Sequence, residues 1–230
     1  IMNDIEGLRI ANNKLYTSSF DDPNNRFIPK TYVSKTPDYL ESVLRNSETD
    51  KMIMKPLDGY GGQGVIMVEK QAIDSFRSLL DFYINSSKDG NYVILQEYVE
   101  GADQGDVRIL MLNGEPIGAM KRVPATGEVR ANVHAGGTVK KHSLSKDEKD
   151  LCKLIGPKLV RDGLYFVGLD VINGKLIEVN VLSPGGIMRI NKLNRTKLQT
   201  KIIDFVENVV QAKRNLQARK SEFLEAIKDA

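Results

Sequence analysis

A glycine-rich segment, KPLDGYGGQGVIMVEK at residues 55–70, constrains the fold more than any other part of the sequence. Three of its glycines match the spacing G-x-G-x-x-G of dinucleotide-binding loops, in which a helix follows the glycines and holds the pyrophosphate. Residues 65–68 here read VIMV, a short apolar run that predicts a strand. The glycines therefore join two strands, which excludes a dinucleotide-binding unit.

The segment also differs from two other kinds of phosphate-binding loop. The P-loop signature is absent because no lysine follows the glycines. Protein kinases carry a glycine-rich hairpin over the nucleotide with their lysine on a later strand, whereas Lys55 precedes the loop and neither H-R-D nor D-F-G occurs. Two interpretations stay open: a flap whose backbone N–H groups approach phosphates, or a turn that is merely rich in glycine.

A second group of polar residues lies in FVGLDVINGKLIEVNVLSPGG, residues 166–186. Side chains alternate along a strand, so Glu178 and Asn180 point to one face. With Asp170 they offer the oxygen ligands that Mg²⁺ prefers beside nucleotide phosphates. The alternative is that Glu178 and Asn180 only face water. The opposite, apolar face would comprise Ile177, Val179 and Val181.

The turn between these strands tests the magnesium hypothesis. Asn173-Gly174 is typical of a two-residue type I′ turn. In that register Asp170 and Glu178 would lie on opposite faces of the sheet. We therefore expect a three-residue loop, either 172–174 or 173–175, because the metal ligands require one parity.

Two charged residues share a face in GDVRILM. Asp106 could accept ribose hydroxyls, and Arg108 could bind phosphate or carboxylate oxygens. The alternative is an exposed charge pair. In the following RVPATGEVRANVHAGG, Arg122 and Arg130 lie in a predicted long loop that suits a lid over an anionic substrate, and His134 is either a general base or a solvated loop histidine.

Charge, the length of apolar runs and the cysteine count limit which partners and which compartment we expect. The net charge is +3 with no basic block, so we expect no nucleic-acid partner. No apolar run reaches the roughly 18 residues of a membrane span, so no membrane partner is expected. The single cysteine, Cys152, excludes an internal disulfide and is expected to be buried and inert in a helix, which fits a reducing cytoplasm.

The local patterns alternate between helix and strand, with two Asn-Gly hairpins at 106–123 and 164–183. This mixture predicts an α+β fold with mainly antiparallel sheets. Ser145 and Glu148 form a capping-box pattern at one helix start. Further strands are expected at 51–55, 65–70 and 92–99, a loop at 124–143, and helices within 1–20 and at 36–47, 71–86, 145–163 and from about 196 to the end.

In this order, the segments resemble an ATP-grasp ligase, and most closely the prokaryotic glutathione synthetases. The resemblance covers residues 3 to about 212, and its motifs are specific as a set. The matching segments are EGLRIANNKLYTSSF, MIMKPLDGYGGQGV, QEYVEGADQGDVRIL, GEPIGAMKRVPATGEVRANVHAGG and IGPKLVRDGLYFVGLDVINGKLIEVNVLSP.

The resemblance implies a role for each matching residue. Arg108 and Arg130 would act on the phosphoryl and acyl groups, and Asp170, Glu178 and Asn180 would bind two Mg²⁺ ions. The substrate would contact Arg122, Asn132, Ser183 and Gly185. ATP would contact Lys14, Lys55, the flap Gly59, Tyr60, Gly61, Gly62, Gln63 and Gly64, the hinge Gln96, Glu97, Tyr98 and Val99, and the ribose-binding Asp106.

The resemblance also implies an organisation and a reaction. It divides the chain into a linking segment 1–30, a small ATP-grasp subdomain 31–99, a C-terminal subdomain 100–213 and a charged helical tail 214–230. The reaction would be ATP-dependent joining of γ-glutamylcysteine and glycine through an acyl phosphate, in the cytoplasm, by a protein that could be a homo-oligomer.

Two departures from the family pattern bear on this expectation. The family carries a further domain before this region, and the chain starts where that domain would end. The family usually has Thr-Ser-Pro-Thr where residues 182–185 read LSPG. Two alternatives therefore stay open: a ligase for another carboxylate and amine, or a nucleotide-binding module that does not ligate alone.

Overall fold

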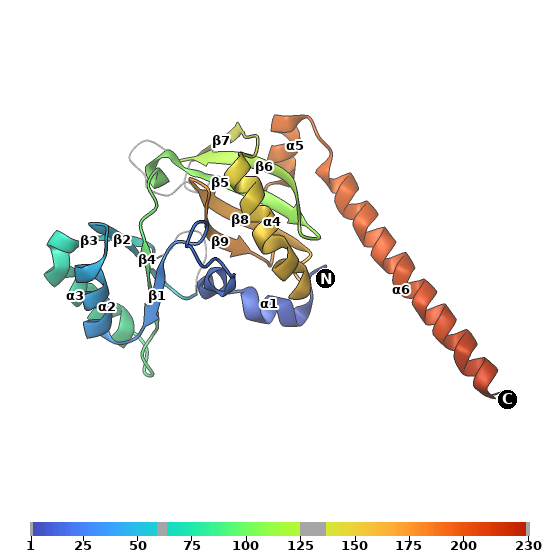
Figure 1. The fold of residues 1–230 in the computed structure, drawn as a ribbon, viewed down its shortest axis with the longest axis horizontal. Helices are drawn as coiled ribbons and strands as arrows, with labels where there is room; N and C mark the ends of the chain where they lie inside the picture. The colour runs from blue at the N-terminus through green and yellow to red at the C-terminus, as the bar shows by residue number, and fades with distance from the viewer. Residues whose placement is uncertain (1, 59–63, 125–136, 229–230) are drawn as a thin grey trace.

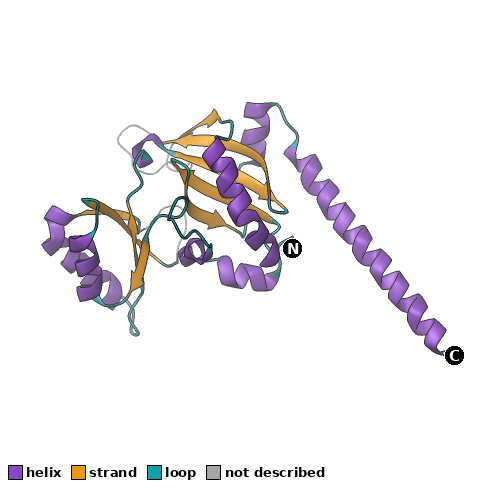
Figure 2. Ribbon diagram, in the orientation of Figure 1, coloured by secondary structure: helices purple, strands orange, loops and turns teal. Residues whose placement is uncertain are grey.

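The computed structural model describes residues 2–58, 64–124 and 137–228. In these residues two antiparallel sheets lie side by side; the smaller has helices on one face, and the larger has helices against both faces (Figures 1 and 2). The expected α+β fold is confirmed. No helix in these ranges is long and apolar enough to cross a lipid bilayer.

The smaller sheet has four strands in the order β1-β4-β2-β3. Two helices, α2 and α3, pack on one face and bury Leu40, Leu44, Phe76 and Leu80 against the strands. Their apolar residues recur at helical spacing, which is why these segments form amphipathic helices. The elements are β1 (Thr31–Ser34), α2 (Pro37–Asn46), β2 (Lys51–Pro56), β3 (Ile66–Glu69), α3 (Ile73–Asn85) and β4 (Val93–Glu97).

The larger sheet has five strands in the order β7-β6-β5-β8-β9. Helix α4 (Lys146–Arg161) covers its core face, and the predicted capping box of Ser145 and Glu148 is present at the helix start. The core lies between α4, the N-terminal segment and alternate residues of the strands. The strands are β5 (Asp106–Leu112), β6 (Glu115–Val123), β7 (Thr138–Lys141), β8 (Phe166–Ile172) and β9 (Lys175–Asn180).

The N-terminal segment packs on the larger sheet. The side chain of Asn3 donates to the carbonyls of Phe166 and Val181, both at 2.8 Å, and accepts from the N–H of Phe166 at 2.7 Å. Helix α1 (Ile5–Ala11) and a 3₁₀ helix (Lys14–Ser19) follow. The segment is therefore part of the core of this sheet, and it carries Lys14 to the space between the two sheets.

The second face of the larger sheet is divided. Its apolar part, with Leu110 and Met120, is covered by α5 (Ile187–Asn194) and the first turns of α6 (Leu198–Lys228). Its other part carries the charged residues of the candidate site. Beyond its first turns, α6 extends away from the body of the molecule (Figure 1).

The hairpin of β8 and β9 does not have the predicted loop length, but it still places Asp170 and Glu178 on the same face of the sheet. The turn is the two-residue Asn173-Gly174, with φ of 46° and 77° and Ile172 paired with Lys175, so the expected three-residue loop is wrong. A β-bulge at Ile177 then shifts the register, so Asp170 lies directly opposite Glu178. The extra residue that brings Asp170 and Glu178 to the same face therefore lies in strand β9 and not in the turn.

Several smaller expectations also differ from the structure. Ile177 lines a cavity beside Glu178 and does not face the core, because it is the bulged residue. Arg122 lies in strand β6 and not in a loop. The short strands β1 and β7 were not predicted, and β7 interrupts the expected loop at 124–143. The expected final helix from about residue 196 is confirmed as α6, whereas the preceding helix α5 was not predicted.

We expect α6 beyond residue 213 to contribute little to stability. Leu198 and Ile202 are buried, whereas Leu216 and Phe223 are exposed. Removal of residues 214–230 should change the free energy of unfolding by less than about 1 kcal/mol, measured by denaturant titration. A chain that ends at residue 196 is the control and should lose about 3 kcal/mol or more with its buried residues. Equal losses would contradict this division of the helix.

We expect deletion of Ile177 to be tolerated. After the two-residue turn, a regular ladder without this residue still places Glu178 opposite Asp170. Thermal unfolding should show a loss within about 2 kcal/mol of wild type. Deletion of Val179, which moves Asn180 to the core face, is the matched control and should prevent folding. The idea is wrong if the two deletions behave alike.

Candidate nucleotide and metal site

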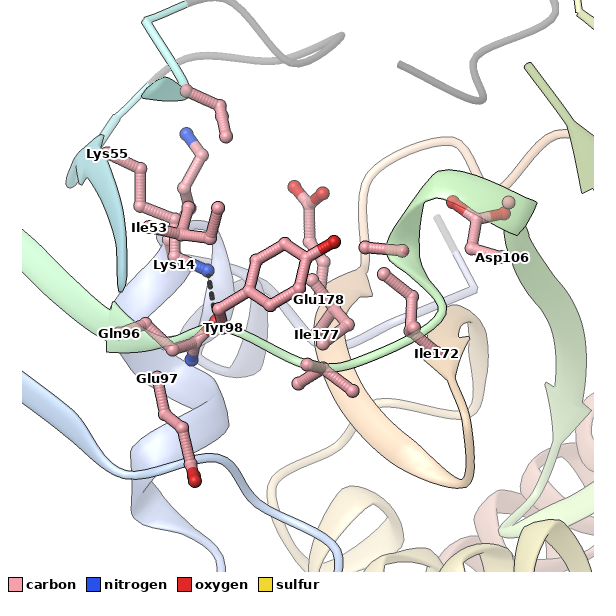
Figure 3. Close-up of a pocket in the computed structure, with 14 residues that line it drawn as sticks. Lys14, Ile53, Lys55, Gln96, Glu97, Tyr98, Asp106, Ile172, Ile177 and Glu178 are labelled. Carbon is pink, nitrogen blue, oxygen red and sulfur yellow. Dashed lines mark hydrogen bonds between the residues drawn. The ribbon is translucent and has the colours of Figure 1, made fainter. Parts of the chain in front are cut away.

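A cavity of about 160 Å³ opens between the two sheets. Figure 3 shows the side chains that line it. One part is apolar and the other carries two lysines and a carboxylate, which suits a ligand with a flat apolar end and an anionic end. The apolar part includes Ile53, Val65, Val99, Ile172 and Ile177, and the charged part includes Lys14, Lys55 and Glu178.

Lys55 is a buried cation at the end of β2. It is 4% exposed, and its Nζ donates to Oε1 of Gln96 at 2.8 Å, the bond drawn dashed in Figure 3. Gln96 in turn donates to Thr31 at 2.8 Å. Burial lowers the pKa of Lys55 to about 8, the nearby charge of Lys14 acts in the same direction, and Glu178 opposes both. A buried cation held by a neutral amide is ready to bind an anion.

Lys14 reaches the same cavity from the N-terminal segment. Its Nζ donates to the carbonyl of Asp58 at 2.9 Å, and its backbone N–H donates to the carbonyl of Leu57 at 3.1 Å. Burial lowers the pKa of Lys14, and Glu178 works against that effect. One lysine therefore comes from the N-terminal segment that packs on the larger sheet and the other from the smaller sheet, and they meet at the start of the glycine-rich loop.

Glu178 faces these lysines from β9. Burial raises its pKa, the charge of Asp170 adds to this effect, and Lys14 and Lys55 oppose it. A cation placed between the two carboxylates would relieve both the burial and the repulsion.

Asp170 and three charged residues on adjacent strands, Arg108, Arg122 and Asp106, form a group of largely buried charges that we call the arginine–aspartate cluster. Arg108 donates to both oxygens of Asp170, at 2.5 and 3.0 Å. Arg122 donates to both oxygens of Asp106 at 2.6 Å, and its Nη2 lies 3.0 Å from Oδ1 of Asp170. Arg108 is 8% exposed, so the alternative of an exposed charge pair is wrong.

The charges of the cluster set the ionisation of Asp170. Burial works to raise its pKa, but Arg108 and Arg122 outweigh that effect and hold the pKa below its usual value. Asp170 is therefore an ionised carboxylate in the absence of any metal. Gly168 permits this arrangement, because a Cβ there would lie 3.2 Å from the side chain of Arg108 and 3.1 Å from Pro184.

The donor chemistry of Asp170, Glu178 and Asn180 fits a divalent cation. Asp170 and Glu178 are paired across β8 and β9, and Asn180 donates to Oδ2 of Asp170 at 3.2 Å. All three offer oxygens on one face of the sheet, as Mg²⁺ requires. Within the described ranges, no three His, Cys, Asp or Glu side chains gather as a metal site, so the predicted set combines two carboxylates with the amide of Asn180.

The predicted hinge leads out of β4 along the cavity. Gln96 and Glu97 end the strand, and Tyr98 and Val99 follow it beside the apolar part. The backbone N–H of Glu97 donates to the carbonyl of Lys30 at 2.9 Å. The resemblance gave a backbone role to this segment; it did not indicate that the Gln96 side chain holds Lys55.

A second cavity of about 450 Å³ shares Lys14 and Glu178 with the first. Ser183, which is predicted to contact the substrate, lines it. Gly185 does not line it, although its carbonyl accepts from Arg108 at 3.3 Å. The N-terminal residues 11–13 form another wall, which the sequence patterns did not indicate because this segment lies far away along the chain.

Part of the predicted site lies outside the described residues. Gly64 lies inside them, with φ of +70°, a backbone conformation that favours glycine. The predicted residues outside are Gly59, Tyr60, Gly61, Gly62, Gln63, Arg130, Asn132 and His134.

Cys152 is buried in α4, as predicted, and burial raises the pKa of its thiol to about 12. Such a thiol is protonated at neutral pH and is a poor nucleophile.

Comparison with known proteins gives one consistent family. Residues 13–195 match the model of the prokaryotic glutathione synthetase ATP-grasp domain. The glutathione synthetase of Thermosynechococcus vestitus is 39% identical over 204 residues, which are 88% of this chain and 61% of that protein. That of Gloeobacter violaceus is 39% identical over 207 residues, or 90% and 61%. The chain thus spans about three fifths of the length of these relatives.

Solved structures agree on the fold. A D-alanine–D-alanine ligase from Bacillus anthracis superposes with a TM-score of 0.61 at 14% identity, over 92% of this chain and 72% of that one. The D-cycloserine synthetase DcsG superposes with a TM-score of 0.57 at 18% identity, over 77% and 64%.

We expect nucleotide affinity to fall as the pH rises through about 8. Lys55 has a free pKa of about 8, and bound phosphate would raise it, so binding takes up protons above this pH. Calorimetric titration of a non-hydrolysable ATP analogue from pH 7.5 to 9.5 should show affinity falling by up to tenfold per unit.

Lys55→Arg is the matched control, because arginine stays charged. It should flatten most of the pH dependence, with a remainder from Lys14. An equal slope in both proteins would contradict the role of Lys55.

Proposed function

Because the chain belongs to the family of the prokaryotic glutathione synthetase ATP-grasp domain, we propose that it is the nucleotide-binding part of an ATP- and Mg²⁺-dependent carboxylate–amine ligase. The substrates we propose are γ-glutamylcysteine and glycine, which would yield glutathione. The relatives that carry this name support the assignment, and their greater length leaves the whole activity a proposal.

One observation carries the proposal: buried Lys14, from the N-terminal 3₁₀ helix, and buried Lys55, from β2, converge on one cavity opposite Glu178. Burying ammonium groups is costly unless an anion balances them. Glu178 supplies one negative charge, and the phosphates of ATP would supply the rest. The apolar wall beside Tyr98 and Val99 suits the adenine base.

The reaction class follows from the cationic side chains that would surround the phosphates. ATP would transfer its γ-phosphoryl group to the substrate carboxylate, and the amine would displace phosphate from the acyl phosphate. Such transfer needs charge neutralisation and positioning and needs no covalent enzyme group. Arg108 and Arg130 would neutralise the transferred group, while Arg122, Asn132, Ser183 and Gly185 would lie toward the substrate.

Asp170, Glu178 and Asn180 would hold the metal, and we propose two Mg²⁺ ions. When bound, these ions would supply the positive charge that neutralises the phosphates. The flap 59–64 would cover the phosphates, Gln96 to Val99 would hold adenine, and Asp106 would lie toward the ribose.

We propose the division 1–30, 31–99, 100–213 and 214–230 for the parts of the chain, with the cytoplasm as its compartment. Its partners would be small molecules, with neither nucleic acid nor membrane, and with a preceding domain that completes the substrate wall. A homo-oligomer is compatible with this proposal.

A ligase for another carboxylate and amine is the second candidate. Leu182 and Gly185 stand where the family usually has threonines, and Leu182 is exposed beside the second cavity. A methyl-rich side chain there cannot replace the hydrogen bonds of a hydroxyl. A module that binds nucleotide without ligating is the third.

The decisive experiment measures ADP release by the chain joined to the preceding domain of a relative. Release should require γ-glutamylcysteine and glycine together, and the isolated chain should turn over more slowly. ADP release only when a different amine replaces glycine would favour the second candidate. Nucleotide binding without ADP release, whichever carboxylate and amine are supplied, would favour the third candidate.

A further inference from the structure

We propose that Arg122 occupies the acceptor position on Asp170 that a divalent cation needs, and that nucleotide phosphates draw it away. Arg122 would then be a positioning residue that couples metal binding to nucleotide binding. This inference rests on the metal site of the proposed function and adds to it a residue that controls when the metal can bind.

The acceptor sites of Asp170 are fully used. An ionised carboxylate has two oxygens with about four lone-pair positions. At Oδ1 lie Nε of Arg108 at 2.5 Å and Nη2 of Arg122 at 3.0 Å. At Oδ2 lie Nη2 of Arg108 at 3.0 Å and Nδ2 of Asn180 at 3.2 Å. A cation that binds Asp170 therefore has to replace a donor.

Arg122 is the donor that can leave at the smallest cost. Arg108 makes two hydrogen bonds to Asp170 and lies directly opposite it in the β5–β8 register. Arg122 makes one contact with Asp170 and two with Asp106. It stays held by Asp106 after the contact with Asp170 is lost, so its charge is never left buried without a partner.

Asn180 is the competing donor. Its contact with Asp170 is the longest of the four, and the amide also lies 3.4 Å from the carbonyl of Gly168. Charge separates the two cases, since an incoming cation repels Arg122 but has no such effect on an amide. The amide oxygen of Asn180 is itself a proposed metal ligand.

The nucleotide gives the displaced guanidinium a new partner. Asp106, which holds Arg122, lines the cavity proposed for ATP. Anionic phosphates entering that cavity would attract Arg122 and leave Oδ1 of Asp170 open to the metal. Linkage makes the coupling reciprocal, so the metal should also strengthen the interaction of Arg122 with the nucleotide.

The test is Mn²⁺ binding by the nucleotide-free chain, with free Mn²⁺ measured by electron paramagnetic resonance. Arg122→Gln should bind Mn²⁺ about fivefold or more tightly than wild type. Arg122→Lys should also bind it more tightly, because a lysine keeps the charge but cannot span Asp106 and Asp170. Lys121→Gln, on the same strand, removes a charge without contacting Asp170 and should leave the affinity unchanged.

A second measurement separates displacement from misfolding. Arg122→Gln should bind a metal-free, non-hydrolysable ATP analogue in EDTA less tightly than wild type, whereas Lys121→Gln should not. Opposite changes for metal and nucleotide are the signature of Arg122 exchanging one partner for the other. A damaged fold would weaken both, and thermal unfolding in EDTA checks it directly.

The failures are distinguishable. If Mn²⁺ binds to wild type and Asp170→Asn abolishes binding, but neither Arg122 variant tightens it, Asn180 yields instead and the inference is wrong. Tightening in Arg122→Gln alone, with none in Arg122→Lys, would reduce the effect to general charge and also overturn it. If no protein binds Mn²⁺ with or without nucleotide, the proposed metal site itself fails.

Discussion

Compensation of buried charge across three neighbouring strands is the constraint on which the site depends. The arginine–aspartate cluster places two cations and two anions on β6, β5 and β8, all largely buried. Removing one member would leave a buried charge without a partner, which is far more costly than never having the pair. The same face has an apolar end under α5 and α6, so one sheet surface serves both as core and as site.

The sequence predicted the elements, and which residues share a strand face, better than it predicted how the strands connect. Alternation placed Glu178 and Asn180 on one face correctly, because the period of a strand is fixed by its geometry. The position of the extra residue could not be predicted in the same way. The Asn173-Gly174 turn satisfied its own preference, and the parity was restored three residues later by a bulge at Ile177.

Other parts were missed because their partners lie far away along the chain. The strand at β7 is four residues long and is defined by pairing with β6, so local pattern could not reveal it. Arg122 was expected in a loop. In GAMKRV, however, Met120 and Arg122 point to one face of the strand and Lys121 to the other, a period-2 pattern that the nearby glycine and proline obscured. The role of Gln96 depends on Lys55, which lies on another strand.

The N-terminal segment shows why ligand groups from distant parts of the chain can meet. Tyr16 donates to Asp162 at 2.7 Å, and Lys158 donates to the same oxygen at 2.8 Å, which fixes the 3₁₀ helix to the end of α4. Gly7 permits the approach, since a Cβ there would lie 2.1 Å from the carbonyl of Asp162. The large sheet therefore holds Lys14, while the small sheet holds Lys55.

The charges of the described residues support an order in which nucleotide and metal would bind in the cavity between the two sheets. The arginine–aspartate cluster sums to zero, and Lys14 and Lys55 exceed Glu178 by one positive charge. Under the proposed function, a nucleoside triphosphate would bring more negative charge than this surplus balances, so additional cations would accompany it. In the proposal for Arg122, the carboxylate of Asp170 would receive one only when a guanidinium leaves. The anion that creates the demand for a cation would then be the group that opens its place.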